Sequence, residues 1–298
     1  MGGIVRILIV TGGKAKERKI SILSSRSIGK SLKKLKHEVE VFDFALGERS
    51  LKKIIHDFDL IFPIIHGREG EGGKLQLLLE DLSVKHMGPK SHSCLKGWDK
   101  FDFKKFCHKN DISTPQWEKV NRKTLAKIKI KPPFVIKTSD EGSSVDMHLI
   151  RNKSQLKSKY IVDLFKRYKY LLIEEFINGV EVTSGIWREK VLPLVEIVPP
   201  DGELFDFENK YNGKTQEIPF APSLSDEMQE KVKAITEKIR VGLQIRHFSR
   251  IDYMVRGEEI FALELNTIPG LTPESLLPKA IKASGMTMEQ ALESIIAE

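Results

Sequence analysis

The sequence predicts an α/β fold, in which an N-terminal α/β domain with a parallel sheet is followed by smaller α+β modules. Two patterns point to this class. Strand and helix signals alternate over the first third of the chain, and hairpin-like strand pairs flank single helices in the remainder. A length of 298 residues with 40% hydrophobic side chains is enough for a sizeable core. Domains run to about 100–200 residues, so we expect one large unit or two to three modules.

The first third predicts strands at 6–10, 38–44 and 59–65, with helical periodicity over 20–35 and again over 75–82. The second strand (EVEVFDF) alternates apolar and polar residues, as a half-buried strand should. The third (DLIFPII) is continuously apolar, which is typical of a strand covered on both faces. Ligands of parallel sheets bind beyond the carboxyl ends of strands, where the Gly-rich loops 11–13 and 66–73 fall.

The middle of the chain predicts a helix at 99–110, strands at 134–137 and 147–150, a helix at roughly 154–168 and a strand at 170–176. The last third predicts strands at 181–187 and 191–198, an irregular stretch 199–222, an amphipathic helix through 228–243, strands at 249–255 and 259–266, and a helix that opens at Thr272-Pro273. We therefore place domain boundaries so that the domains comprise residues 1–95, 96–180 and 181–298.

Composition and charge exclude several classes of protein. Lys plus Arg total 49 and Asp plus Glu 41, and this excess of +8 is scattered, which favours anionic small molecules over nucleic acid. No stretch approaches the ~20 apolar residues that span a bilayer. The N-terminal run lacks a signal-peptide cleavage pattern, and two cysteines without C-x-x-C spacing predict neither disulfides nor a zinc site. We expect a cytoplasmic protein.

Common site motifs are absent. Gly73-Lys74-Leu75 superficially matches a P-loop, but Leu75 stands where Ser or Thr must ligate Mg²⁺. The first strand is not followed by G-x-G-x-x-G, and G-x-S-x-G and H-E-x-x-H do not occur. Dinucleotide binding and the simplest serine-hydrolase and zinc-protease chemistries are therefore disfavoured.

A carboxylate pair late in the chain is the first candidate for chemistry. Asp252 and Glu264 lie on adjacent predicted strands, and the two-residue period places Asn266 on the face of Glu264. Three oxygen ligands suit Mg²⁺, and a carboxylate in the apolar strand FALELN is costly without a cation. The alternative is a surface carboxylate pair that is salt-bridged to a nearby Lys or Arg.

Three further features have alternatives of their own. Lys137 ends the strand FVIK beside the loop DEGSS, where it can meet a phosphate or be one more surface lysine. The strand ending Glu174-Glu175 followed by Glu181 can bind adenine and ribose, although this signal is weak alone. Gly270 allows close backbone approach, so its N–H can face an oxyanion, or the loop can be a plain strand-to-helix connection.

Together these features resemble the ATP-grasp enzymes and, more closely, the D-alanine–D-alanine ligases. The matching segments run in the family's order over essentially the whole chain: GGKAKERKIS (12–21), HGREGEGGKLQ (66–76), WDK (98–100), VIKTSDEGSSV (135–145), LIEEFINGVE (172–181), NKY (209–211), RIDYM (250–254) and ELNTIPGLTPESLLP (264–278). The resemblance implies a two-subdomain ATP-grasp fold after the N-terminal domain, with ATP between the subdomains. It also implies a role in peptidoglycan synthesis and a homodimer.

The resemblance further implies residue roles. For the nucleotide these are Lys100 and Lys137 at the phosphates, Glu174 with the backbone of Glu175, Phe176 and Ile177 at adenine, Glu181 at ribose and Lys210 at the γ-phosphate. Asp252, Glu264 and Asn266 would bind two Mg²⁺ or Mn²⁺ ions. For the amino acids they are Glu17, Ser143 and Tyr211 as a hydrogen-bonded set at the first D-alanine, His66 beside it, Arg250 and the Gly270 N–H at the reacting carbonyl, and Ser275 and Leu276 at the second carboxylate.

The implied reaction is phosphoryl transfer from ATP to the first D-alanine, followed by attack of the second amine on the acyl phosphate. The resemblance also implies that Tyr211 favours D-alanine over D-lactate as the second substrate. An ATP-grasp ligase for another amino or hydroxy acid, and a non-catalytic nucleotide-binding protein, are the alternatives. Three positions depart from the family pattern: Asp146 for Gly, Ser249 for Gly and Cys94 for Ser. A carboxylate at 146 would repel ATP unless it points away.

Overall fold

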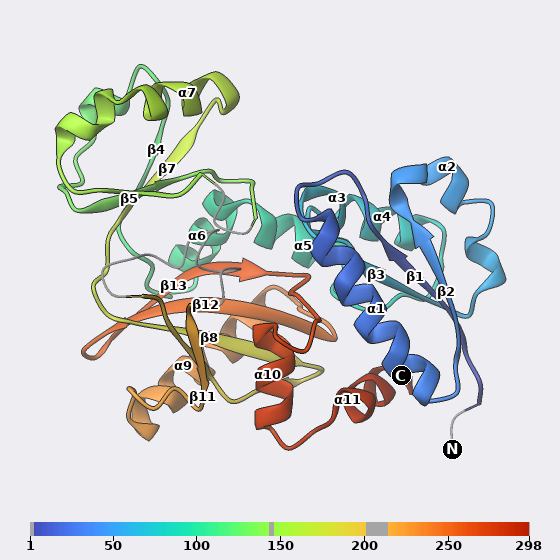
Figure 1. Ribbon diagram of the computed structural model, residues 1–298. Coiled ribbons are helices and arrows are strands. Elements are labelled where there is room, and N and C mark those ends of the chain that lie inside the picture. Colours follow the sequence, from blue (N-terminus) through green and yellow to red (C-terminus); the bar gives the residue numbers. More distant parts are fainter. Residues whose placement is uncertain (1–2, 143–145, 201–213, 298) are drawn as a thin grey trace.

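The computed structural model describes residues 3–142, 146–200 and 214–297 of the chain. Its strands form three sheets, each in its own region of the molecule (Figure 1). The first sheet is parallel and the other two are antiparallel, which confirms the predicted α/β class with a parallel N-terminal sheet and later α+β units. None of the helices in the described ranges is long and apolar enough to cross a membrane.

The N-terminal sheet has the order β2-β1-β3, built from β1 (Arg6–Thr11), β2 (Glu38–Asp43) and β3 (Leu60–Ile64). Alternate residues of β1 enter different cores. Ile7 and Ile9 pack in the cluster that holds Ile28 of α1 (Arg18–Lys34), whereas Leu8 packs with Leu75 of α4 (Lys74–Asp81). The sheet is thus covered on both faces, as the apolar β3 sequence predicts. Short helices η1 (Phe44–Leu46), α2 (Glu48–Leu51), η2 (Ile55–Asp57) and α3 (Arg68–Glu71) complete the domain.

Helices α5 (Ser91–Trp98) and α6 (Lys100–Lys109) lead to the central sheet, whose order is β4-β7-β5-β6. Its strands are β4 (Trp117–Val120), β5 (Phe134–Lys137), β6 (His148–Ile150) and β7 (Leu171–Glu175), with η3 (Leu125–Lys127) between β4 and β5. The predicted continuous helix at 154–168 is wrong. It is divided into η4 (Lys153–Lys157) and α7 (Lys159–Arg167), because the Ser158 side chain accepts a hydrogen bond from Ile161 N and begins a new helix.

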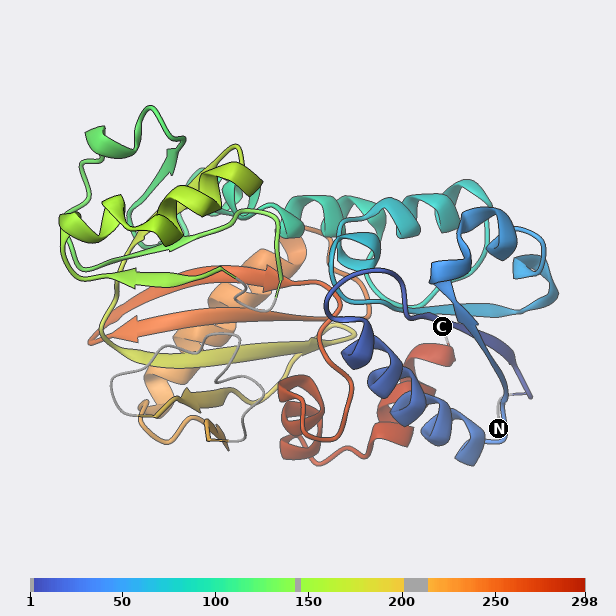
Figure 2. The ribbon, with the colours of Figure 1, turned by 45° about the horizontal axis from the view of Figure 1, so that its top comes forward.

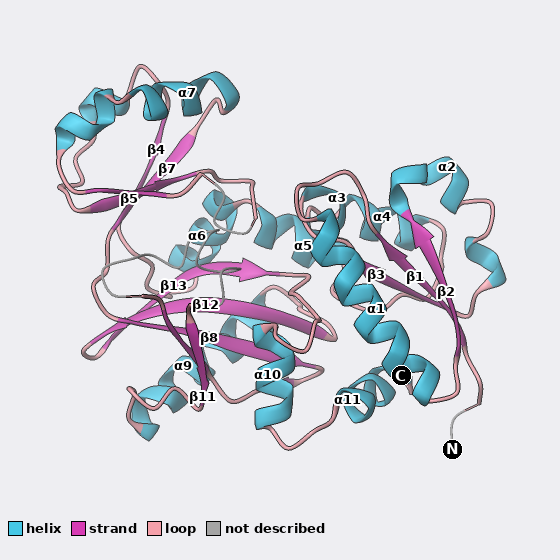
Figure 3. Cartoon of the chain, viewed as in Figure 1, coloured by secondary structure: helices cyan, strands magenta, loops and turns pink. Residues whose placement is uncertain are grey.

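The largest sheet has the order β11-β10-β8-β12-β13, with β9 paired to β8. Figure 3 shows β8, β12 and β13 of this sheet side by side. It contains β8 (Val180–Trp187), β9 (Lys190–Val191), β10 (Val195–Val198), β11 (Gln216–Pro219), β12 (Phe248–Arg256) and β13 (Glu259–Asn266). The amphipathic helix α9 (Asp226–Gly242) packs Val232 and Ile239 against Ile251 and Tyr253 of β12. Strand β11 corrects the prediction that residues 199–222 are irregular throughout.

The last two helices return to the N-terminal domain. Helix α10 (Leu276–Ala283) begins after Ser275, so the prediction that this helix opens at Thr272-Pro273 is wrong; residues 272–275 form a turn in which Ser275 N donates to Thr272 O. Helix α11 (Met288–Ile296) lies beside α1 (Figure 2), where Glu289 accepts from Ser31 and Lys34. The hydrophobic cluster of Ile9 also contains Leu277 and Leu292, so the first and last segments share a core.

Candidate active site

Two adjoining cavities lie at the meeting point of the three regions. The first encloses about 790 Å³, in part open to solvent, and lies between the central and the largest sheets. Its walls include the predicted nucleotide residues Lys100, Lys137, Glu174, Glu175, Phe176, Ile177 and Glu181, together with Asp252 and Glu264. The second encloses about 1160 Å³ and is lined by the predicted substrate residues His66, Arg250, Gly270, Ser275 and Leu276, with Glu264 and Asn266. Lys100 and Glu264 line both cavities.

The predicted carboxylate pair lines the first cavity, and Glu264 also lines the second. Asp252 of β12 is paired directly with Glu264 of β13, so the two side chains share one face, as predicted. Arg250 holds Asp252 through two hydrogen bonds, Nε to Oδ1 at 2.8 Å and Nη2 to Oδ2 at 2.9 Å. Lys100 Nζ lies 3.2 Å from Glu264 Oε2. Each carboxylate thus has a basic partner, as the alternative of a salt-bridged carboxylate pair predicts, but Asp252 is buried rather than on the surface.

Arg250 and Asp252 form a buried ion pair. Burial alone lowers the pKa of the Arg250 guanidinium, but the adjacent Asp252 carboxylate outweighs this effect and raises it. The Thr183 hydroxyl of β8 also donates to Asp252 Oδ1, at 2.6 Å. Sequence reasoning missed Thr183. Its only signal is that β8 precedes β12 in an antiparallel sheet, where Thr183 pairs with Asp252. The guanidinium is thus charged and fixed in direction at the edge of the second cavity.

One of the three predicted metal ligands has a buried oxygen without a partner in the ranges that the structure describes. Asn266 Oδ1 is buried and has no hydrogen-bond partner among the described residues, although a buried amide oxygen is normally paired. It lines the second cavity together with Glu264. Carboxylate and amide oxygens are the ligands that Mg²⁺ and Mn²⁺ prefer. The described residues contain no cluster of three or more His, Cys, Asp or Glu side chains placed to hold a metal, and both carboxylate oxygens of Asp252 accept from Arg250.

Lys100 connects the cavity wall to the loop after β5. Asp99 caps α6 by accepting from Phe101 N at 2.7 Å, which places Lys100 at the first turn of the helix. The Lys100 backbone N–H donates to Ser139 O at 3.0 Å, and its Nζ donates to Glu141 O at 3.0 Å. The start of the DEGSS loop is therefore held over the first cavity by the lysine that also contacts Glu264.

Glu174 lies between two lysines. Its Oε2 is 2.5 Å from Lys137 Nζ, and its Oε1 accepts from Lys104 Nζ, a residue that sequence reasoning missed. Burial alone raises the pKa of the Glu174 carboxyl, but the two ammonium groups outweigh this effect and hold it below its usual value. The signal for Lys104 is its spacing of four from Lys100, which places both lysines on one side of α6.

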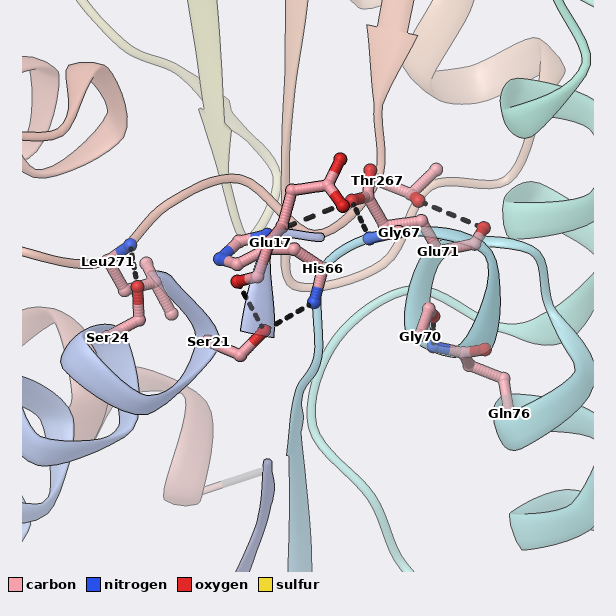
Figure 4. Close-up of polar contacts among 10 residues, drawn as sticks. All are labelled: Glu17, Ser21, Ser24, His66, Gly67, Gly70, Glu71, Gln76, Thr267 and Leu271. Carbon is pink, nitrogen blue, oxygen red and sulfur yellow. Dashed lines mark hydrogen bonds and ion pairs between the residues drawn. The ribbon is translucent and has the colours of Figure 1, made fainter. Parts of the chain in front are cut away.

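A hydrogen-bonded chain shapes the second cavity (Figure 4). Ser21 of α1 accepts from His66 N at 3.0 Å, and Glu71 Oε1 accepts from Gly67 N at 2.8 Å and lies 3.8 Å from His66 Nδ1. The other ring nitrogen of His66, Nε2, is buried without a partner in the described part of the chain. Glu17 lies beside Gly67, since a Cβ at Gly67 would come within 3.3 Å of its carboxylate oxygen.

The loop after β13 brings the remaining substrate residues into the second cavity. A Cβ on Gly270 would come within 2.6 Å of Ser275 Oγ, so only glycine fits without moving that hydroxyl. Ser275 Oγ is in turn 2.8 Å from Thr272 Oγ1. Leu271 N donates to Ser24 Oγ of α1 at 3.1 Å, which ties the loop to the N-terminal domain (Figure 4). Ser143, Lys210 and Tyr211 lie outside the described residues.

The departure at Asp146 has a structural explanation. Asp146 has φ 59°, a left-handed conformation in which glycine is the easy choice. Its carboxylate points to α7, where Arg167 donates from Nη1 at 2.6 Å and from Nη2 at 3.1 Å, and Tyr168 donates at 2.9 Å. The charge is therefore neutralised on the side of α7. Ser249 and Cys94, the other departures, are buried.

Two antiparallel α+β units with a lysine- and carboxylate-lined cavity between them, preceded by a parallel α/β domain, define an ATP-grasp enzyme. The family model of the D-ala D-ala ligase C-terminus matches residues 97–297. A D-alanine–D-alanine ligase from Aquifex aeolicus (strain VF5) is 36% identical and covers 98% of this chain and 100% of its own length. One from Coprothermobacter proteolyticus is 32% identical, covering 98% and 99%. The crystal structure of the Bacillus anthracis enzyme complexed with ATP matches with a TM-score of 0.84 at 28% identity, covering 98% of this chain and 96% of that one. The chain belongs to the D-alanine–D-alanine ligase family of ATP-dependent carboxylate–amine ligases.

Proposed function

We propose that the protein joins two D-alanines to D-alanyl-D-alanine, with conversion of ATP to ADP and phosphate, for peptidoglycan synthesis. The observation that carries this proposal is the pair of adjoining cavities with Lys100 and Glu264 in the shared wall. We name the first the nucleotide cavity and the second the amino-acid cavity. A phosphoryl group at the shared wall can reach a carboxylate in the amino-acid cavity.

The nucleotide cavity supplies the groups for ATP. Lys137 and Lys100 would face the phosphates, because both lysines line this cavity and the Lys100 ammonium contacts Glu264. Glu174 and the backbone of residues 175–177 would hold adenine, and Glu181 would hold ribose. Lys210, outside the described residues, would reach the γ-phosphate. Asp252, Glu264 and Asn266 would hold two Mg²⁺ or Mn²⁺ ions, which offset charge on the phosphoryl oxygens when bound.

The amino-acid cavity supplies the groups for acyl transfer. Glu17, with Ser143 and Tyr211, would hold the first D-alanine, and His66 would lie beside it. The first carboxylate attacks the γ-phosphorus and displaces ADP, which forms the acyl phosphate. The amine of the second D-alanine then attacks the acyl carbon, loses a proton and displaces phosphate. The Arg250 guanidinium and the Gly270 N–H would meet the tetrahedral oxyanion, a contribution worth about 3 kcal/mol per donor. Ser275 and Leu276 would hold the second carboxylate.

The second candidate function is an ATP-grasp ligase that takes another amino or hydroxy acid second. This alternative is kept because two residues would select the second substrate. One is Tyr211, which lies outside the described residues, and the other is Ser275, whose hydroxyl already contacts Thr272. We further propose a homodimer, on the family resemblance, and a cytoplasmic location, where ATP is available.

The test is a coupled ADP-release assay with D-alanine, L-alanine, D-serine and D-lactate as second substrates, with each product identified by mass. The proposal expects D-alanine to give the largest kcat/KM and a dipeptide of two D-alanines. ADP release with another second substrate at a higher kcat/KM would replace the proposal by the second candidate. ATP binding without ADP release on any acceptor would contradict both.

A further inference from the structure

The most deeply buried lysine of the site has no role in the proposed reaction. Lys104 lies on α6 with a side chain that is 0% exposed, and its ammonium donates to Glu174 Oε1. Lys137 takes the other carboxylate oxygen, at 2.5 Å. Glu174 and Lys137 line the nucleotide cavity, whereas Lys104 does not. Lys104 therefore contacts the carboxylate from the side away from the ligand.

A buried lysine requires a reason, because burial lowers the pKa of the Lys104 ammonium against the opposing effect of Glu174. One cation would suffice to neutralise Glu174. With Lys137 as its only partner, the buried pair would be neutral, and the field of Lys137 would be directed largely at the carboxylate. With Lys104 added, one carboxylate faces two ammonium groups, and the three carry a net positive charge.

Sheet register fixes where that charge lies. Val135 is directly opposite Glu174 across β5 and β7, and Lys137 is two residues further along the same strand on the same face. The register therefore brings Glu174 and Lys137 together on one face of the sheet. Glu174 lies between the two ammonium groups, so this carboxylate is the contact through which Lys104 reaches Lys137.

We propose that Lys104 is a positioning residue for nucleotide phosphates: it neutralises Glu174 from behind, which leaves the charge of Lys137 available to phosphate oxygens. The inference rests on the proposed function in one respect, the placing of phosphates at Lys137. It predicts that the charge of Lys104 increases the affinity for ATP and does not change the affinity for a nucleoside without phosphates. A lysine that merely supported the fold would affect both ligands alike.

The experiment compares binding of ATP and of adenosine, by isothermal titration calorimetry with Mg²⁺ and without D-alanine, to the full chain and to Lys104→Gln. Glutamine retains an N–H donor for Glu174 and removes the charge. The matched control is Lys105→Gln, the next residue of α6, whose side chain is 64% exposed and paired with Asp102. We expect Lys104→Gln to weaken ATP about tenfold or more, since hydrogen bonds to charged groups are worth this much, and to change adenosine less than twofold. The control should change neither.

Equal losses for ATP and adenosine in Lys104→Gln, or no loss for either, would overturn the inference. If Lys104→Gln does not fold, the ATP affinity of Glu174→Gln is compared with that of the double variant, because Glu174→Gln leaves no carboxylate for Lys104 to neutralise. Adding Lys104→Gln there should leave ATP affinity within about threefold, whereas a tenfold further loss would show that Lys104 does not act through Glu174.

The proposed function is tested separately by dipeptide formation. A wild-type protein that binds ATP but forms no dipeptide would refute the ligase and leave this inference standing. A wild-type protein that binds ATP no better than adenosine would refute the inference, whatever product it forms.

Discussion

In the nucleotide cavity, charged side chains lie in contact with opposite charges: Lys137 with Glu174, and Asp252 with Arg250, whose guanidinium lines the amino-acid cavity. In the amino-acid cavity, two buried polar atoms, His66 Nε2 and Asn266 Oδ1, have no partner within the described residues. The first region offers a ligand a prearranged field of paired charges. The second offers unsatisfied atoms, for which a ligand completes the hydrogen bonding. ATP binding should therefore respond to charge changes, and amino-acid binding to changes of shape and of hydrogen bonding.

The largest effect is expected where the cavities meet. Glu264→Gln keeps the shape of the side chain but removes the charge that faces Lys100 and would hold metal. We expect kcat to fall about 100-fold or more with the fold intact, because several kcal/mol of charge stabilisation are lost. ADP release at saturating ATP and varied Mg²⁺ measures it. Glu259→Gln, at the exposed end of the same strand and paired with Arg256, is the control. An unaltered rate of ADP release for Glu264→Gln at limiting Mg²⁺ would contradict a role of Glu264 in metal binding.

A change of shape should affect the amino-acid cavity alone. The Cβ of Gly270→Ala would lie 2.6 Å from Ser275 Oγ, so this hydroxyl must rotate away from Thr272. We expect KM for the second D-alanine to rise about tenfold, the cost of a displaced hydrogen bond to a charged group, while the Kd for ATP stays constant. Gly29→Ala on α1 adds a Cβ at ordinary contact distance, 3.6 Å from Ile9, and should change neither constant. A parallel loss of ATP affinity would show that the two cavities are not separable in this way.

Asp146 allows a smaller test of the nucleotide side. Asp146→Asn removes the ion pair to Arg167 that ties the end of the DEGSS loop to α7. We expect KM for ATP to rise about threefold, since a partly exposed ion pair is worth 1 kcal/mol or less, with KM for D-alanine unchanged. The control is Asp163→Asn, which removes an exposed pair to Lys166 on the same helix. If KM for ATP falls instead, Asp146 repels the nucleotide despite its contact with Arg167.

The sequence predicts most of the fold and much of the composition of both cavities. Periodicity identifies β1, β5, β12 and β13 to within one or two residues, because each is apolar on at least one face and ends at a loop. It misses β4 and β11, which are short edge strands with largely exposed or half-buried residues, and it misplaces the start of α10, where Ser275 follows a turn. The partners Lys104 and Thr183 are missed for another reason: their meaning comes from strands and helices far away in the sequence.

The smallest effect on activity is expected away from both cavities, at His86, where the N-terminal sheet meets the segment before β12. Burial, with the charge of Arg246, lowers the pKa of the His86 imidazole from 6.5 to about 4. Between these two pH values the unfolded chain binds a proton at His86 that the folded chain resists. The contribution of His86 to the free energy of unfolding therefore falls as the pH drops from 6.5 to 4 and is constant above this window. The shift corresponds to about 3 kcal/mol.

His86→Gln should flatten the fall of Tm between pH 6.5 and 4 and leave kcat at pH 8 unchanged, whereas the exposed His92→Gln should keep the wild-type slope. An unchanged slope in His86→Gln would assign acid sensitivity to other groups, and a lower kcat at pH 8 would mean that this interface, and not only the cavities, sets the rate.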